Sequence, residues 1–245
     1  MSIATRVIAI AVVATGMAGA DTHGTVTINT SALASSANGP FTLDLQFIEG
    51  DGAGDSNNTV TLSNFSLGGG AIVTPAVSTT GGVTVSVSPL TIVLVDSSFF
   101  QDVRFSFTPG SVLSFQYDST SNADLVAPDT FTLAILDNTG NEIPTNNPNG
   151  LNSFVELDLP TAGSGTQITA SGDTSGIGVS SSSTIIPSCD VKGNSTATVS
   201  DVQAILNQSL GTAARSNDLN GDGVLNVVDI QLVINAALGQ GCPVS

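Results

Sequence analysis

A pattern of one polar loop followed by one amphipathic helix occurs twice near the C-terminus, with an offset of 28 residues. In the second copy, the loop from Asp218 to Asp229 precedes apolar residues with helical spacing, and the predicted helix ends at Gly239. The first copy begins at Asp190 in the same register, and its helix ends at Gly211. Because one amphipathic helix cannot bury its apolar face alone, we expect the two copies to pack together.

The second loop carries an oxygen donor at each position that a bound calcium ion requires. Calcium takes six to eight oxygen ligands, and a twelve-residue loop supplies them from positions 1, 3, 5, 7, 9 and 12. Here those donors are Asp218, Asn220, Asp222, the Val224 carbonyl, Asn226 acting through a water, and Asp229. Gly223 at position 6 permits the sharp turn. The alternative interpretation is an Asn/Gly-rich turn that caps a helix.

The first loop is a weaker candidate for calcium. Its acidic and polar positions include Asp190, Asn194, Thr198 and Asp201. However, Lys192 stands at position 3 and Ser195 replaces the glycine at position 6. Since a lysine brings a charge of the same sign as the ion into a site with ligand distances of about 2.4 Å, we expect weak binding or none. One hypothesis is that the Lys192 ammonium itself fills this loop.

With Asp at position 12 of both loops, residues 189–242 resemble a type I dockerin. The resemblance implies two EF-hand-like calcium loop–helix repeats, and a cohesin-like protein module as the partner. Dockerins that bind cohesins often present Ser-Thr at loop positions 10 and 11, where this chain has Val199–Ser200 and Val227–Val228. These apolar residues either contact a different partner surface or pack inside the module.

The chain has two cysteines, Cys189 and Cys242, which stand just outside the two loop–helix copies. Two unrelated thiols are one interpretation, but the position of the pair around the repeat favours a disulfide. Such a bond would tie the ends of the module together. It requires an oxidising compartment.

The N-terminus has the features of a secretory signal peptide. Residues 1–6 carry one positive charge, residues 7–14 are an unbroken run of Val, Ile and Ala, and Ala18-Gly19-Ala20 is a cleavage site of the A-x-A kind. The apolar run is too short to span a bilayer, so we expect no membrane span. The sequence therefore predicts a secreted or cell-surface protein that begins near Asp21.

The charge of the chain excludes two classes of partner. Its formal net charge is −16, and only Arg104, Lys192 and Arg215 remain as cations once the predicted leader is removed. A chain so poor in Lys and Arg cannot neutralise phosphates, which argues against nucleic acid and against an anionic membrane surface.

Alternating apolar and polar residues predict β-strands between the leader and the repeat. Clear examples are Phe41–Phe47, Val103–Phe107, Phe131–Ile135 and Val155–Leu159, and clusters of Gly, Asn and Asp separate them. We expect an antiparallel β-sandwich or jelly roll over residues 21–165. Residues 166–187 are predicted as a last edge strand and a Ser/Gly-rich linker, and 188–245 as the dockerin-like module.

The β-rich region also resembles a family of exported bacterial proteins that usually carry a PEP-CTERM sorting tail. The resemblance rests on Phe41–Phe47, Val60–Phe65, Phe131–Asp137 and Pro144–Leu159. No enzymatic activity defines that family, which is associated with exopolysaccharide-producing bacteria. The dockerin-like module stands where the tail would be, which suggests another means of retention at the surface.

The sequence offers little for catalysis, and we expect no enzyme. His23 is the only histidine and lies close to the predicted mature N-terminus, where chains are usually disordered. Glu49, Glu142 and Glu156 are the only glutamates, and their neighbours place them in turns or on polar strand faces.

A carbohydrate-binding accessory protein of a polysaccharide-degrading system is the alternative function. Sugar-binding platforms usually rely on exposed aromatic rings, but the chain has no Trp and a single Tyr, Tyr117. Phe99 and Phe100 are the candidate ligand contacts, because adjacent residues of a strand point to opposite faces. The loop with Asp51, Asp55, Asn57 and Asn58 is either a further calcium site or a plain turn.

Overall fold

The computed structural model describes residues 22–120, 127–159, 166–186, 188–192, 197–213, 217–220, 222 and 224–242. The predicted signal peptide therefore lies outside the described residues. Asn194 and Ser195 of the first loop and Gly223 of the second also lie outside them.

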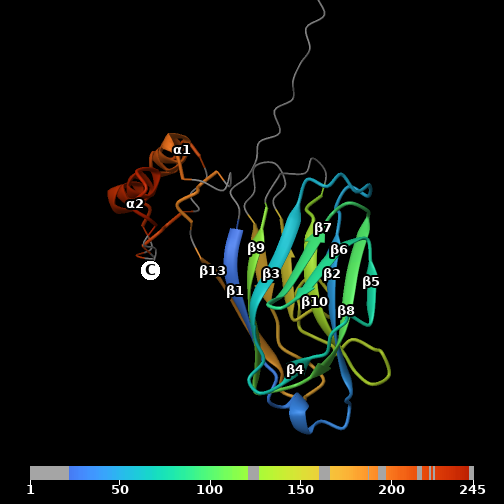
Figure 1. Ribbon diagram of the computed structural model, residues 1–245. Coiled ribbons are helices and arrows are strands. Elements are labelled where there is room, and N and C mark those ends of the chain that lie inside the picture. Colours follow the sequence, from blue (N-terminus) through green and yellow to red (C-terminus); the bar gives the residue numbers. More distant parts are fainter. Residues whose placement is uncertain are drawn as a thin grey trace, which may run out of the picture.

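Two antiparallel sheets pack face to face as a sandwich (Figure 1). The six-stranded sheet runs, in order, β13 (Ser180–Ile186), β1 (Thr22–Asn29), β9 (Val112–Ser119), β3 (Thr59–Ser66), β7 (Leu90–Val95) and β6 (Gly82–Val87). The seven-stranded sheet runs β12 (Gln167–Ala170), β11 (Val155–Asp158), β10 (Thr130–Leu136), β2 (Phe41–Ile48), β8 (Phe100–Thr108) and β4 (Ala71–Ile72), with β5 (Ser78–Thr80) also beside β8. A short 3-10 helix, η1 (Leu33–Ser35), joins β1 to β2. The prediction of a mainly β sandwich is confirmed.

The period-two pattern decides which side chains fill the space between the sheets. On β2, Phe41, Leu43, Leu45 and Phe47 are all buried in one core with their counterparts from both sheets. The largest fully buried members are Tyr117, Phe47, Phe105, Phe115, Phe131, Phe154, Ile28, Leu33, Leu43, Leu45, Leu62 and Ile92. Burial of these side chains is the main stabilising contribution in such a fold.

The serine run at residues 180–183 is part of a strand, so the prediction of a flexible linker is wrong there. β13 pairs with β1 over seven residues, from Asn29↔Ser180 to His23↔Ile186. The Ser181 hydroxyl donates to the carbonyl oxygens of Phe154 (2.6 Å) and Ser171 (2.8 Å). Hydroxyl contacts and an available sheet edge outweigh the low strand preference of serine. β12 lies where an edge strand was expected.

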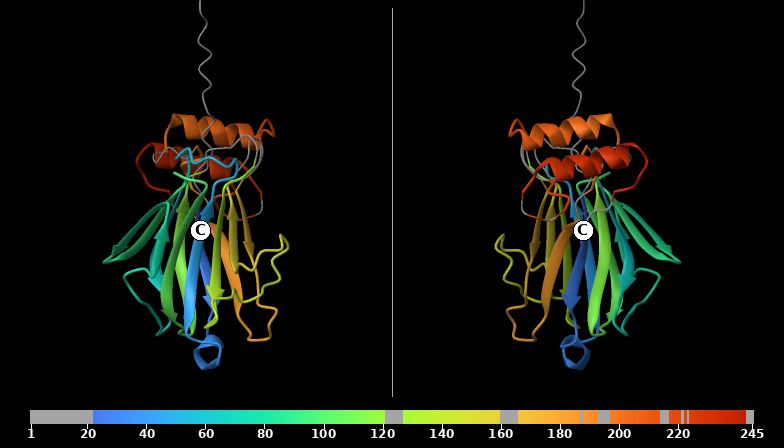
Figure 2. Two further views of the ribbon diagram at one scale, coloured as in Figure 1. Left: turned by 90° about the vertical axis from the view of Figure 1, so that its right-hand side faces the viewer. Right: turned by 90° about the vertical axis from the view of Figure 1, so that its left-hand side faces the viewer.

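Two helices follow the sandwich: α1 (Val199–Ser209) and α2 (Val227–Ala237). They start at capping boxes formed by Thr198 with Asp201 and by Asn226 with Asp229. Their small core contains Cys189, Val191, Ile205, Leu219, Leu225 and Val233 and shares no residue with the core of the sandwich. Figure 2 shows both helices beyond one end of the sheets. None of the described helices is long and apolar enough to cross a membrane.

The disulfide Cys189–Cys242 is present, as the cysteine positions predicted. Cys189 is buried in the small core, and the bond joins the segment before the first loop to the end of the second copy. The two loop–helix copies therefore form a covalently closed unit.

Candidate calcium loop and docking surface

The aspartate at position 12 ties both ends of each loop together. Asp229 is fully buried: its Oδ1 accepts from the backbone N–H groups of Leu219 (2.8 Å) and Asn220 (3.3 Å), and its Oδ2 accepts from Asn226 (2.8 Å). In the first loop, Asp201 accepts hydrogen bonds in the same way from the backbone N–H groups of Lys192 and Thr198, both at 2.8 Å. These two residues are the counterparts of Asn220 and Asn226, 28 positions earlier in the chain.

The 28-residue relation extends along both helices. Gln203 donates to Asn207 at 3.0 Å in α1, and Gln231 donates to Asn235 at 2.8 Å in α2. Ile205 and Val233, at equivalent positions, are both fully buried. The helices of the two copies thus make matching contacts.

The polar groups of the second loop converge. The amides of Asn220 and Asn226 donate to Oδ2 of Asp222 at 3.0 and 3.3 Å, and the Asn226 amide also donates to the Val224 carbonyl at 2.9 Å. The hydrogen bond from Asn220, then that from the Val224 N–H, lowers the pKa of Asp222, which keeps this carboxylate charged. Asp218 is half-buried at the start of the loop.

This donor set suits a hard cation such as calcium, because every candidate ligand atom is an oxygen. A carboxylate has about four lone-pair positions, and Asp229 already uses three of them for backbone N–H groups. Asp229 therefore has one position left for a metal ion, on Oδ2. The shorter Asp side chain at position 12 is consistent with a contact through a single oxygen.

The first loop differs at its third position. Lys192 is exposed, and the hypothesis that its ammonium group fills the loop stays a prediction. Both oxygens of Asp201 accept hydrogen bonds, since Oδ2 also accepts from the Thr198 hydroxyl at 2.8 Å. Asp190 is half-buried, and Asn194 lies outside the described residues.

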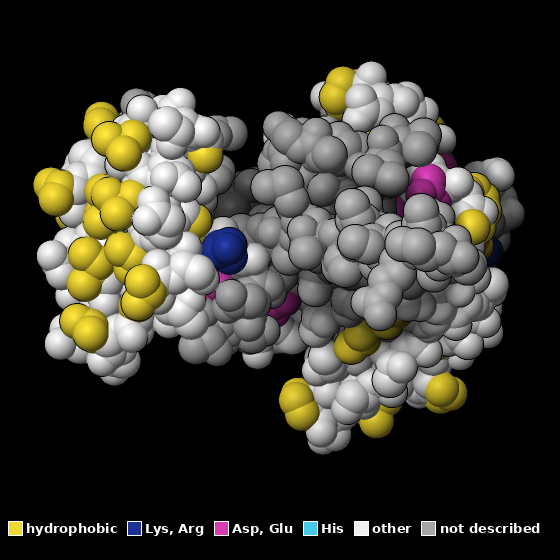
Figure 3. All heavy atoms as spheres, turned by 90° about the horizontal axis from the view of Figure 1, so that it is seen from above, with side chains coloured by type: hydrophobic (Ala, Val, Ile, Leu, Met, Phe, Trp, Pro, Cys, Tyr) yellow, Lys and Arg dark blue, Asp and Glu magenta, His cyan; other side chains and the backbone are white. Residues whose placement is uncertain are grey.

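Large apolar side chains are exposed on the helical module. Val199 and Val227, at equivalent positions, are 81% and 73% exposed. The surface consists of Val199, Leu210, Val224, Val227, Val228 and Leu238, six of the eleven large apolar residues exposed in the described part of the chain. Figure 3 shows hydrophobic side chains gathered over this part of the molecule. The alternative that Val199, Val227 and Val228 pack inside the module is therefore wrong. We call these six residues the apolar docking surface.

The aromatic residues divide as the sequence suggested. Phe99 is 56% exposed, whereas Phe100 is half-buried at the start of β8, so one of the pair faces out. Tyr117 is buried in the sandwich core and is not available to a ligand.

A polar hollow of about 380 Å³ lies beside the outer face of the seven-stranded sheet. Its lining residues are Asp44, Arg104, Leu136, Gly140, Asn141, Glu142 and Asn152. Arg104 forms ion pairs with Asp44 at 3.0 Å and with Asp102 at 3.5 Å. Burial, together with the neighbouring Asp44, raises the pKa of Asp102 to about 7. No local sequence pattern predicts this hollow, because Asp44, Arg104 and Asn141 come from three distant segments.

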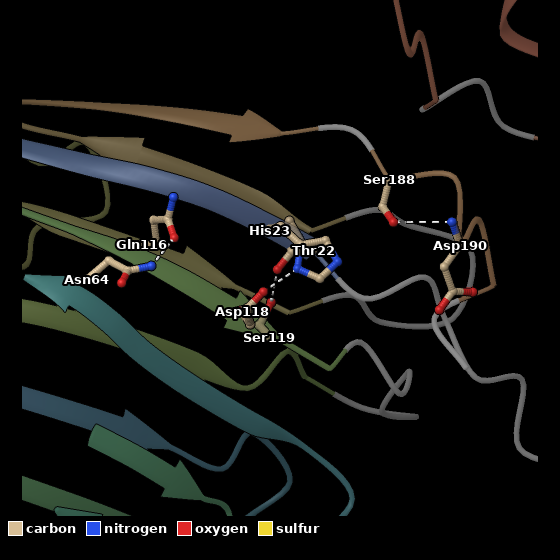
Figure 4. A network of polar contacts seen from close by, with 8 residues as sticks. All are labelled: Thr22, His23, Asn64, Gln116, Asp118, Ser119, Ser188 and Asp190. Carbon is tan, nitrogen blue, oxygen red and sulfur yellow. Dashed lines mark hydrogen bonds and ion pairs between the residues drawn. The ribbon is translucent and has the colours of Figure 1, made fainter. Parts of the chain in front are cut away.

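The single histidine lies in β1, not in a disordered end. His23 pairs with Asp118 through Nδ1 and Oδ1, and both side chains are largely accessible (Figure 4). The neighbouring Ser119 is buried, and its hydroxyl donates to the Thr22 carbonyl at 3.4 Å. Because Ser119 follows Asp118 in the strand, it points to the opposite face. The Ser119 hydroxyl is therefore directed away from the His23–Asp118 pair.

Two of the three glutamates are not solvated, contrary to expectation. Glu49 and Glu156 are buried, and Glu156 accepts from the amides of Asn147 (2.6 Å) and Asn149 (2.9 Å). These bonds hold the loop before β11 against the outer face of the sheet. Glu142 is exposed at the rim of the hollow.

Comparisons with models of protein families, with curated proteins and with solved structures found no match for this chain.

Proposed function

We propose that this protein is a secreted, non-catalytic attachment protein. Its C-terminal module would bind calcium in the loop from Asp218 to Asp229 and attach the sandwich to a cohesin-like protein module at the cell surface. The observation that carries the proposal is the apolar docking surface, in which four of the six residues form two equivalent pairs of the two loop–helix copies, Val199 with Val227 and Leu210 with Leu238. Exposed apolar patches of this kind are typical of protein–protein interaction sites.

Two features favour a protein partner over a charged polymer. The docking surface consists of Val and Leu side chains, whose burial is favourable only against another apolar surface. The chain has a formal net charge of −16, which disfavours polyanions. A complementary apolar partner surface therefore fits best.

Calcium would act on the docking surface through α2. The second loop ends in the capping box of Asn226 and Asp229, and Val227 and Val228 are the first residues of the helix. An ion that neutralises Asp218, Asp222 and Asp229 would hold this helix start in place. Extracellular modules bind calcium at roughly 10⁻⁴ to 10⁻³ M, so we expect a constitutive structural ion and not a signal.

Pull-down from the native secretome tests the proposal. The mature chain should retain a partner with a cohesin-like module in calcium and release it in EGTA. The double variant Val199→Asp/Val227→Asp should lose the partner while its helices still form. Val87→Asp is the matched control, because Val87 is similarly exposed on β6 of the sandwich. Retention by the docking-surface variant, or capture that ignores calcium, would refute the proposal.

A carbohydrate-binding role is the second candidate, and the polar hollow favours it. Asp44, Arg104, Asn141, Glu142 and Asn152 supply the charged and amide groups that bind sugar hydroxyls. Affinity electrophoresis on a panel of polysaccharides tests this function. Retardation by one glycan that Asn141→Ala or Phe99→Ala abolishes would support it, and equal mobility on every gel would exclude it for that panel.

A further inference from the structure

Two buried carboxylates meet at the end of the sandwich nearest the helices. Asp96 follows β7 and Asp129 precedes β10, and both are fully buried. Asn58, also fully buried, joins them: its backbone N–H donates to Oδ2 of Asp96 and its side-chain amide donates to Oδ2 of Asp129, both at 2.9 Å. Gly50 donates its N–H to Oδ1 of Asp129 at 2.8 Å. The loop between β2 and β3 therefore closes over both carboxylates.

One oxygen of this pair has no hydrogen-bond donor. Oδ1 of Asp96 is buried without a partner among the described residues, and the Asp96 side chain faces that of Asp129. The ion pairs formed within the described ranges involve only His23 and Arg104, and neither reaches these aspartates. Burying two carboxylates side by side without a cation is strongly unfavourable.

Electrostatics lead to the same conclusion. Burial, then the adjacent Asp129 and the nearby Asp55, raises the pKa of Asp96 to about 8. The two buried carboxylates therefore disfavour each other's charge. A bound cation would neutralise both carboxylates.

The donor chemistry indicates which cation fits. Asp96 and Asp129 offer carboxylate oxygens, with no sulfur or imidazole in the pair's contacts, which suits a hard cation. The Asn58 Oδ1 accepts from the Thr120 hydroxyl at 3.3 Å.

We propose that Asp96 and Asp129, held together by Asn58, form a calcium site at this end of the sandwich, separate from the C-terminal loop. Two carboxylates supply fewer than the six to eight oxygens that calcium takes, so water would complete the coordination. Calcium accepts such mixed, irregular oxygen shells, whereas magnesium requires near-ideal octahedral geometry. This site does not depend on the proposed docking function.

Such an ion would fix three segments that are distant in sequence. They are the loop after β2, the turn after β7 and the segment before β10. The turn after β7 carries the exposed Phe99, whose carbonyl accepts from the Glu49 N–H at 3.1 Å. Calcium would therefore stiffen the end of the sandwich that bears this ring.

Equilibrium dialysis against calcium tests the stoichiometry. The mature chain with Asp222→Ala, which disables the C-terminal loop, should still bind one calcium per chain. Adding Asp96→Asn should abolish this binding. Asp137→Asn is the matched control, since Asp137 lies after the opposite end of β10 and should leave binding unchanged. The difference in bound calcium between the unmodified chain and the Asp222→Ala variant gives the number of ions in the C-terminal loop. The two sites are therefore counted separately, and absence of binding at one does not obscure binding at the other.

Scanning calorimetry supplies a second readout. In the Asp222→Ala background, 10 mM calcium should raise the melting temperature of the sandwich by roughly 3–10 °C for a dissociation constant of 10⁻⁴ to 10⁻³ M. With Asp96→Asn added, the shift should vanish, and stability in EGTA should equal or exceed that of the background because the repulsion is removed. The proposal is overturned if the background binds no calcium, if Asp96→Asn leaves binding intact, or if magnesium gives an equal shift.

Discussion

Removing the Cys189–Cys242 disulfide should unfold the helical module while leaving the sandwich folded. The bond closes a loop with a sequence separation of 53 residues, and loop-entropy arguments assign about 4 kcal/mol to a cross-link of this length. Six buried apolar residues form the core of the module within its described segments. A core of this size supplies about 3–5 kcal/mol at most, so the cross-link is comparable to the whole stability of the module.

The assay is calorimetry combined with circular dichroism at fixed calcium concentration. The unmodified chain should show a sandwich transition and a helical transition, because the two cores share no residue. Without the cross-link, the helical module should already be unfolded near room temperature, so the helical transition should disappear. This result is expected both for the reduced unmodified chain and for the double variant Cys189→Ala/Cys242→Ala. Comparing the two separates loss of the cross-link from loss of the buried Cys189 side chain. A helical transition that keeps its midpoint after reduction would refute the reasoning.

Three further predictions concern the sandwich and the helix caps. The folded-state pKa of Asp102 is raised from 3.8 to about 7, so the contribution of this group to stability is present below pH 4 and is lost as the pH rises through 7. The loss is at most about 4 kcal/mol. The variant Asp102→Asn should therefore flatten the dependence of the melting temperature on pH. Gly24→Ala should destabilise the sandwich by about 3 kcal/mol in urea, since a Cβ there would overlap the Thr184 carbonyl and the Tyr117 ring; a change below about 0.5 kcal/mol would contradict the packing. Thr198→Ala should cost the module about 1 kcal/mol whether or not calcium is present, as measured by helical melting, and a calcium-dependent cost would show that the first loop binds the ion.

The helices were predictable because their determinants are local. The apolar stripe, the side chains at Thr198 and Asn226, and the glycines after each helix lie within one short segment, and α1 and α2 follow them. The same holds for β2, whose alternation places Leu43 and Leu45 in the core. Hydrophobic periodicity and helix capping depend on residues that are close together in the chain, so both can be recognised in a single sequence.

The polar sites of the sandwich could not be predicted in this way. Asp96 and Asp129 lie 33 residues apart and meet only because β7 ends and β10 begins at the same end of the sandwich. The sequence drew attention to Asn58 through its Asn/Asp loop, but no local pattern connects that loop to either aspartate. β13 was missed for a related reason, since the partner that turns a serine run into a strand is β1, at the other end of the chain.

β13 also determines how the protein would respond to tension. Its pairing with β1 covers seven residues, and the strand runs toward the end of the sheets where the helices lie (Figure 1). If the module were held by a partner and the body of the sandwich were pulled away, the load would act along this strand. Its backbone hydrogen bonds would then share the load and break together, so the serine-rich strand would act as a mechanical clamp between the sandwich and its attachment point.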